Sequence, residues 1–151
     1  MKTNTAIIPM MMIATTIAAC CTKKHCEDQN IIHQINFQNF TKEEIDTLLI
    51  SRFTKGTNLT SSIDSFYAYA ENYNTVGVYS DMDGLVNDFE IKLISNQSKY
   101  QLSNFIINKK QCNGCFPVGG DFYNKLESYN LNGVTQITES SKGGASITIT
   151  K

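Results

Sequence analysis

The chain is poor in the residues that most catalytic sites need. It contains no tryptophan and only two histidines, His25 and His33. A catalytic triad or a Cys–His pair would have to draw its base from one of these two, and both lie at the front of the expected mature chain. With no tryptophan, and with tyrosine common in strands, the aromatic residues are expected to serve core and strand packing rather than a carbohydrate or peptide surface.

Excess charge and long apolar runs are also missing. Thirteen basic residues face 14 acidic ones, for a formal net charge of −1. This balance provides no basic field for nucleic acid or for an anionic membrane surface, so neither is an expected partner. The most apolar segment, 6–19, contains Pro9 and is shorter than the roughly 20 residues that a transmembrane helix needs. A transmembrane anchor is therefore not predicted.

The N-terminal segment is built like a signal peptide. Residues 1–5 carry one cation, Lys2, and residues 6–19 are uncharged. The run Ile17-Ala18-Ala19-Cys20 closes it with an aliphatic residue, two small residues and a cysteine. This motif resembles the lipobox of bacterial lipoprotein precursors. Plain secretion, with cleavage after the two alanines, and an uncleaved N-terminal segment are the alternatives.

The resemblance to lipoproteins implies cleavage before Cys20 and a covalent diacylglycerol, with an added N-acyl chain such as palmitate, on that residue. Two or more acyl chains give stable attachment to a membrane. The expected division is a signal peptide at 1–19, a lipidated flexible tether at 20–30 and a single domain at 31–151. The mature chain is long enough for one domain with a real core.

The cysteines then separate into one anchor and two pairs. An extracytoplasmic location favours disulfide formation by the four cysteines other than Cys20. Two disulfides and three connectivities are open to them. Local pairing within each short loop is favoured, and a link from the tether to the domain is the alternative. The four disulfide candidates are Cys21, Cys26, Cys112 and Cys115.

Short apolar runs separated by Asn, Gly, Ser and Asp begin at Ile31 and predict an all-β domain. The clearest strand is predicted for 87–94, whose apolar residues occupy alternate positions and face the core. Its predicted water-facing residues are Asp88, Glu90 and Lys92. This pattern is typical of a strand with one face buried and one face in water.

Other segments complete the predicted sheet. Asn132-Gly133 between two alternating runs predicts a hairpin. Segment 45–54 is favoured as a strand, although the preceding 41–44 fits a capping box and one helical turn. Segment 63–70 fits a strand or a helical stripe. Seven or eight short strands indicate an immunoglobulin-like β-sandwich, with a barrel as second choice.

Cys112-Asn113-Gly114-Cys115 has the spacing of a thiol-redox pair, which needs a helix after its first cysteine. The following Phe-Pro-Val-Gly-Gly cannot continue a helix, so a structural disulfide is preferred. A zinc site would need further ligands from the tether.

A second acidic motif fits part of a calcium-binding loop. Asp81, Asp83 and Glu90 occupy ligand positions around Gly84, but Tyr79 stands where the first acidic ligand belongs. An Asp-Gly loop that enters a strand explains the same residues. No metal or cofactor is therefore predicted.

The segment 40–47 is similar to stretches of small uncharacterised envelope lipoproteins, a resemblance that implies no activity. The expected protein is a lipid-anchored, extracytoplasmic β-domain of the bacterial envelope with a structural or interaction role and no catalytic residue. Its expected partners are the membrane, through the anchor, and an envelope protein or glycan. The alternative is a small envelope thiol-redox or metal-binding protein that uses Cys112 and Cys115, or Asp81, Asp83 and Glu90.

Overall fold

The computed structural model describes residues 27–72, 75–77, 82–111, 122–138 and 145–151. Most of this part of the chain lies in β-strands, because its β-branched and aromatic runs suit them. The elements are β1 (Ile32–Gln38), α2 (Lys42–Ile45), β2 (Thr47–Thr54), β3 (Ser62–Asn72), β4 (Thr75–Gly77), β5 (Asn87–Leu93), β6 (Lys99–Gln111), β7 (Phe122–Leu131), β8 (Val134–Ile137) and β9 (Ala145–Thr150).

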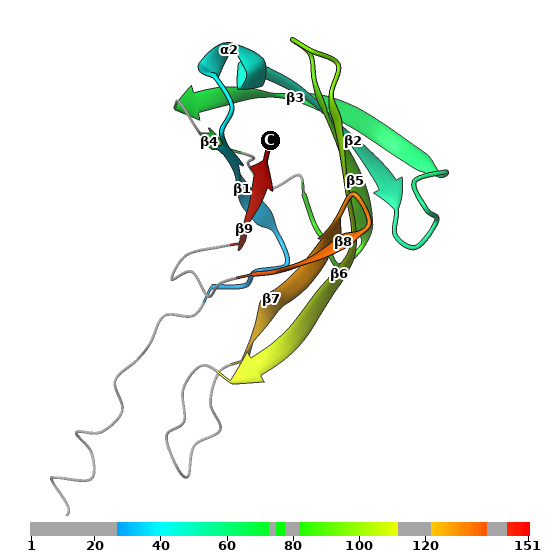
Figure 1. Ribbon diagram of the computed structural model, residues 1–151. Helices are drawn as coiled ribbons and strands as arrows, with labels where there is room; N and C mark the ends of the chain where they lie inside the picture. Colours follow the sequence, from blue (N-terminus) through cyan, green and yellow to red (C-terminus); the bar gives the residue numbers. More distant parts are fainter. Residues whose placement is uncertain (1–26, 73–74, 78–81, 112–121, 139–144) are drawn as a thin grey trace, which may run out of the picture.

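The strands form one mixed sheet in the order β8-β7-β6-β5-β2-β3-β4-β1-β9. All neighbours are antiparallel except β1 and β9, which are parallel. Figure 1 shows the sheet curling around its own inner face into a half-barrel. The all-β prediction is confirmed. The finer prediction of an immunoglobulin-like sandwich is not, because the strand order describes one continuous sheet rather than two facing ones.

The core fills the concave face of this sheet. Phe89, Ile91 and Leu93 of β5 are completely buried, as the alternation in the sequence predicted. They pack with buried residues from the neighbouring strands and from β1 and β9 on the far side of the half-barrel. Burial of each large apolar side chain contributes about 1.5–3 kcal/mol to stability. The curl therefore gives a single sheet the enclosed core that two layers would otherwise provide.

Asp88 departs from its predicted position in water. Its side chain lies on the outer face of β5, opposite Phe53 of β2, yet it is 2% exposed. The turn after β2 covers it, and the Gly56 N–H donates to Asp88 Oδ2 at 2.9 Å. Glu90 and Lys92, the next two residues on that face, remain partly exposed as predicted. Asp88 is buried by a turn 32 residues away in sequence, and the alternation within one strand does not predict such a contact.

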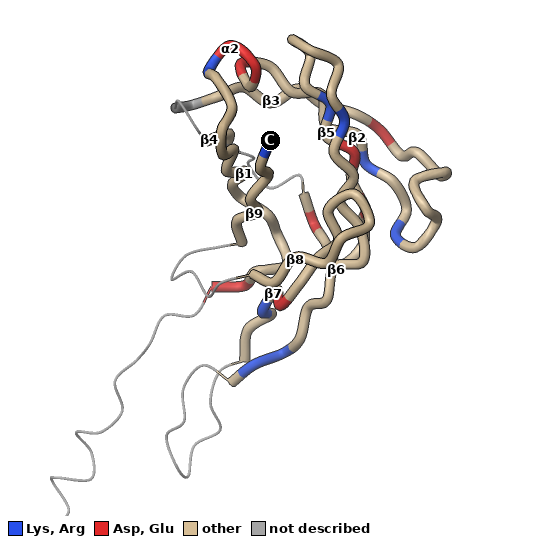
Figure 2. The backbone as a smooth tube through the Cα atoms, viewed as in Figure 1, with Lys and Arg blue, Asp and Glu red and all other residues tan. Residues whose placement is uncertain are grey.

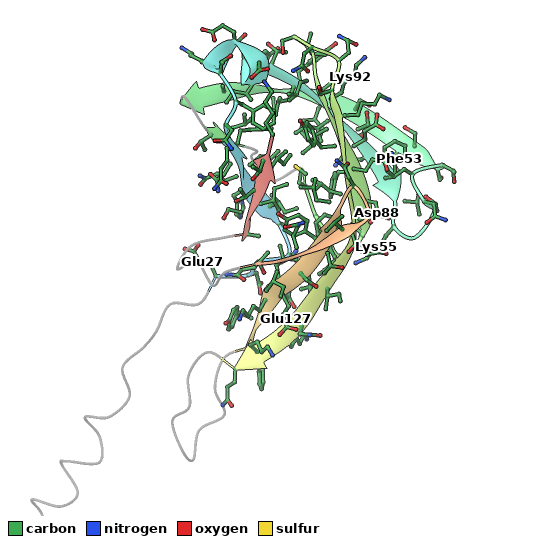
Figure 3. The ribbon with its side chains drawn as sticks, viewed as in Figure 1. Glu27, Phe53, Lys55, Asp88, Lys92 and Glu127 are labelled. Carbon is green, nitrogen blue, oxygen red and sulfur yellow. The ribbon has the colours of Figure 1, made fainter. Side chains whose placement is uncertain are left out.

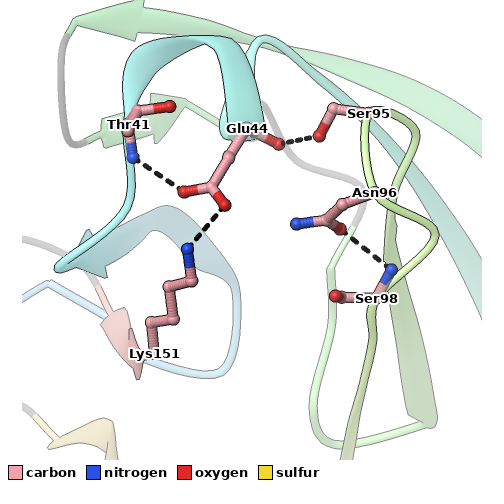
Figure 4. A network of polar contacts seen from close by, with 6 residues as sticks. All are labelled: Thr41, Glu44, Ser95, Asn96, Ser98 and Lys151. Atoms are coloured by element: carbon pink, nitrogen blue, oxygen red, sulfur yellow. Dashed lines mark hydrogen bonds and ion pairs between the residues drawn. The ribbon is translucent and has the colours of Figure 1, made fainter.

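The segment 41–54 contains both predicted structures in succession. α2 is the helical turn, with a capping box in which the Thr41 N–H donates to Glu44 Oε2 at 3.0 Å, and β2 follows from Thr47. Figure 4 shows that Glu44 also joins two other segments. Its Oε1 lies 2.6 Å from Lys151 Nζ, and its backbone oxygen accepts from Ser95 Oγ at 2.8 Å. This network ties the segments at one end of the half-barrel.

Two further predictions are settled by the backbone. Segment 63–70, which fitted a strand or a helix, lies within β3. Asn132 and Gly133 have φ values of 50° and 82°, and β7 and β8 pair on either side of them as a hairpin. Both positive angles are those that a type I′ turn requires.

A tyrosine side chain closes the half-barrel between β7 and β9. The Tyr129 hydroxyl donates to Thr148 O at 3.2 Å and accepts from Thr148 N at 3.1 Å. Burial raises the pKa of this hydroxyl, which keeps its proton in place as a donor. The Tyr129 ring stacks on Phe105 at 6.1 Å between centroids. One side chain thus satisfies backbone groups that no further strand pairs.

The chain enters the domain alongside β7. Gln29 N donates to Asn124 O at 2.7 Å, and Asn124 N donates to Asp28 Oδ1 at 2.7 Å. Ile32 N then donates to Met82 O at 2.8 Å as β1 begins. Residues 27–30, assigned to the predicted tether, therefore already belong to the folded part of the chain.

Candidate binding surface

The outer face of β3 carries large apolar side chains in water. Ile63, Tyr67 and Tyr69 are 55%, 59% and 63% exposed, whereas Phe66 and Ala68 between them turn toward the core. Side chains at alternate positions of a strand share a face. The three exposed residues therefore form a stripe along one strand, which we call the β3 stripe.

Neighbouring strands extend this stripe into a surface. Leu49 of β2 lies directly opposite Tyr67, and Lys92 of β5 lies opposite Leu49. The next row across the same strands contains Ser65 of β3 and Ser51 of β2. The Ser65 hydroxyl donates to Ser51 Oγ at 2.8 Å. β2 and β5 are paired on both sides, whereas β3 pairs with β2 along the stripe and with β4 only from Ala70 onward. The pairing with β2 holds the backbone of the stripe on one side.

The chemistry of this surface suits binding more than catalysis. Tyrosine rings offer flat apolar area and a hydroxyl that bonds with polar groups. Beyond them Glu90 pairs with Lys99 at 2.9 Å, and Lys92 adds a cation to the row of Tyr67 and Leu49. Figure 2 shows acidic and basic residues interspersed over the described chain rather than gathered into one field. The surface provides apolar contact area beside polar and charged groups.

The expectation that tyrosines serve packing holds for Tyr129, which is buried, and fails for Tyr67 and Tyr69. The signal that locates the stripe is alternation along β3. Phe66, Ala68 and Ala70 share the inner face, which leaves the tyrosines outside. Sequence alone did not choose between strand and helix here, and so it did not place these residues on an exposed face.

An ion pair joins Asp64, near the start of β3, to Arg52, which lies opposite it near the end of β2. Arg52 donates to both carboxylate oxygens of Asp64, with Nε 2.6 Å from Oδ1. These hydrogen bonds hold the pKa of Asp64 below its usual value. The Arg52 guanidinium carbon also lies 5.9 Å from the ring centroid of Phe66. The pair orders the rim of the half-barrel.

Two of the calcium-loop candidates, Asp83 and Glu90, lie within the described residues, and each has another partner. Asp83 Oδ1 accepts from Leu85 N at 2.8 Å, which is the turn-stabilising role expected of an Asp-Gly loop. Glu90 is paired with Lys99 instead. The described ranges contain no group of three His, Cys, Asp or Glu side chains that would hold a metal ion. Asp81 lies outside the described residues.

All five cysteines lie outside the described residues. The predicted lipidation of Cys20, the disulfide pairing, and a thiol or zinc role for Cys112 and Cys115 therefore stay predictions. The same applies to the signal peptide at 1–19. No helix within the described ranges is long and apolar enough to cross a bilayer.

Lys55 has a structural role that the sequence did not reveal. Its ammonium donates to the backbone oxygens of Gly84 at 2.8 Å and Phe105 at 3.1 Å. Beside this anchor, Asp88 Oδ1 is buried without a hydrogen-bond partner in the described structure. A Cβ at Gly84 would lie 2.9 Å from Phe105 Cγ, so the loop before β5 packs tightly on β6. Figure 3 shows Lys55 and Asp88 close to Phe53 at this end of β2.

Comparisons with protein-family models, curated proteins and solved structures found no match to this chain.

Proposed function

We propose that this chain is a lipid-anchored, extracytoplasmic β-domain of the bacterial envelope that acts as an interaction module. Cys20 is the proposed attachment point, on the resemblance of Ile17-Ala18-Ala19-Cys20 to a lipobox. Two or more acyl chains hold the domain at a membrane. The domain then presents the β3 stripe to an envelope protein or a glycan.

The observation that supports the binding role is the exposure of Ile63, Tyr67 and Tyr69 along β3, where the strand is paired with β2. Large aromatic residues that are aligned and left in water are costly for solubility and are enriched where proteins bind partners. The sheet fixes their backbone, so binding costs little ordering of the protein.

The surface is tested by binding to two purified envelope preparations, an insoluble glycan fraction and a protein fraction. The Tyr67→Ser, Tyr69→Ser chain should lose at least tenfold in affinity for whichever preparation retains the parent chain. Ile106→Ser, Phe122→Ser is the matched control, because these residues are also exposed but lie on β6 and β7. Equal binding by all three chains would remove the stripe from the proposal.

The anchor is tested separately by intact-mass analysis of the mature chain and by membrane fractionation. Cys20→Ser should abolish the added diacylglycerol and release the protein from membranes. Cys21→Ser alters the neighbouring thiol and should leave both properties unchanged. A parent chain with an unmodified N-terminus would refute lipid attachment without bearing on the β3 stripe.

A further inference from the structure

The two edges of the curled sheet differ in how their backbone groups are satisfied. β9 forms one edge, and the Tyr129 hydroxyl caps both backbone groups of Thr148 there. β8 forms the other edge and pairs only with β7. Unpaired strand edges present alternating N–H and C=O groups that can bind another strand.

The hairpin register identifies the free groups on β8. Leu131 and Val134 flank the two-residue turn, and farther along Thr138 N donates to Glu127 O at 3.0 Å. The backbone groups of intervening residues alternate in direction. Thr135 and Ile137 therefore direct their N–H and C=O groups away from β7, and neither has a partner for them in the described structure.

The side chains leave this edge open. β8 reads Val-Thr-Gln-Ile, with no charge, proline or glycine, which are the features that commonly protect edge strands. Val134 is 62% exposed and Ile137 is 85% exposed. An extended strand is the ligand whose shape and hydrogen-bonding groups complement such an edge.

We propose that β8 pairs antiparallel with β8 of a second copy of this chain. Gln136 lies on the twofold axis opposite Gln136 of the other copy, and Thr135 and Ile137 exchange backbone hydrogen bonds across the interface. The strand carries no charge, so two copies meet without like-charge repulsion. The pairing adds about four backbone hydrogen bonds, buries Ile137 and joins two half-barrels into one continuous sheet.

Sedimentation velocity of the full chain in detergent tests this pairing over a range of concentrations. The parent chain should show a concentration-dependent dimer. Ile137→Lys should weaken dimerisation at least tenfold, since it places ammonium groups beside the axis. Ile106→Lys introduces the same charge at an exposed position on β6, outside both proposed surfaces, and should dimerise like the parent. Thermal unfolding of both variants checks that their fold is retained.

The register has its own test. Gln136→His would place two imidazoles side by side across the axis, because directly opposed Cβ atoms in a sheet lie about 4.5–5.5 Å apart. Zn²⁺ should then strengthen the dimer of this variant tenfold or more over the parent chain measured with the same Zn²⁺. A response equal to that of the parent would refute the proposed axis. A parent chain that stays monomeric, including one that instead binds an added extended peptide at β8, would overturn the second copy as occupant.

Discussion

The inner and outer faces of the sheet differ in how far their large apolar side chains are exposed, although both follow the alternation of residues along a strand. On β5 the inner residues Phe89 and Ile91 are completely buried, whereas on β3 the outer residues Tyr67 and Tyr69 stay mostly in water. Close packing restricts the size and shape of side chains on the inner face, because a cavity or an extra group there lowers the stability of the fold. The outer face is free of that constraint. The large apolar side chains exposed on it are the basis of the proposed binding role.

The largest contrast is expected from truncating one aromatic on each face. Phe89→Ala should lower the free energy of unfolding by about 3–5 kcal/mol, because it leaves a cavity at the centre of the core. Tyr67→Ala should change it by about 0.5 kcal/mol or less, as is usual for exposed sites. Urea unfolding followed by circular dichroism measures both. Similar losses for the two variants would show that the β3 stripe is part of the core.

A smaller loss of stability is expected from removing the Tyr129 hydroxyl, which hydrogen-bonds to β9. Tyr129→Phe keeps the ring stacked on Phe105 but removes the hydroxyl from both backbone groups of Thr148. Leaving such groups unsatisfied costs about 1–3 kcal/mol. Hydrogen exchange of the Thr148 amide should accelerate by more than the global loss of stability explains. Tyr69→Phe removes an exposed hydroxyl and should change neither quantity.

The smallest effect is expected at the exposed end of the half-barrel. Hydrogen bonds from Lys151 and from the backbone of Thr41 hold the pKa of Glu44 below its usual value. A lowered pKa in the folded state means that the carboxylate stabilises the fold above the pKa of the unfolded chain, and that this contribution is lost as the pH falls through the folded pKa. Glu44→Gln should therefore destabilise the protein slightly at neutral pH and hardly at all in acid.

A double-mutant cycle isolates this contact. Glu44→Gln combined with Lys151→Gln should show a coupling energy at pH 7 that fades in acid. The expected loss is smaller than that of Tyr129→Phe, because solvent screens an exposed ion pair. Coupling of equal size at both pH values would show that charge is not what links the two residues.

The sequence predicted those parts of the molecule that depend on neighbours in the chain. Alternation placed Phe89 and Ile91 correctly, and Asn132-Gly133 correctly predicted the β7–β8 hairpin. The burial of Asp88 was missed because it depends on a turn far away in sequence. The single curved sheet was missed for the same reason, since parallel pairing of β1 with β9 joins distant segments. The β3 stripe was missed because exposure is defined only once the concave face is known.

The pairing of β1 with β9 also determines when the domain can finish folding. Ile35 lies opposite Ile147, so their contact closes a loop of more than a hundred residues. Contacts between such distant segments slow folding, because the entropy of closing the loop is lost before the contact stabilises anything. A nascent chain cannot cover the inner side chains of β1 until β9 has been made. Until then those side chains stay available to chaperones, and the maturation of the domain is governed by its last strand.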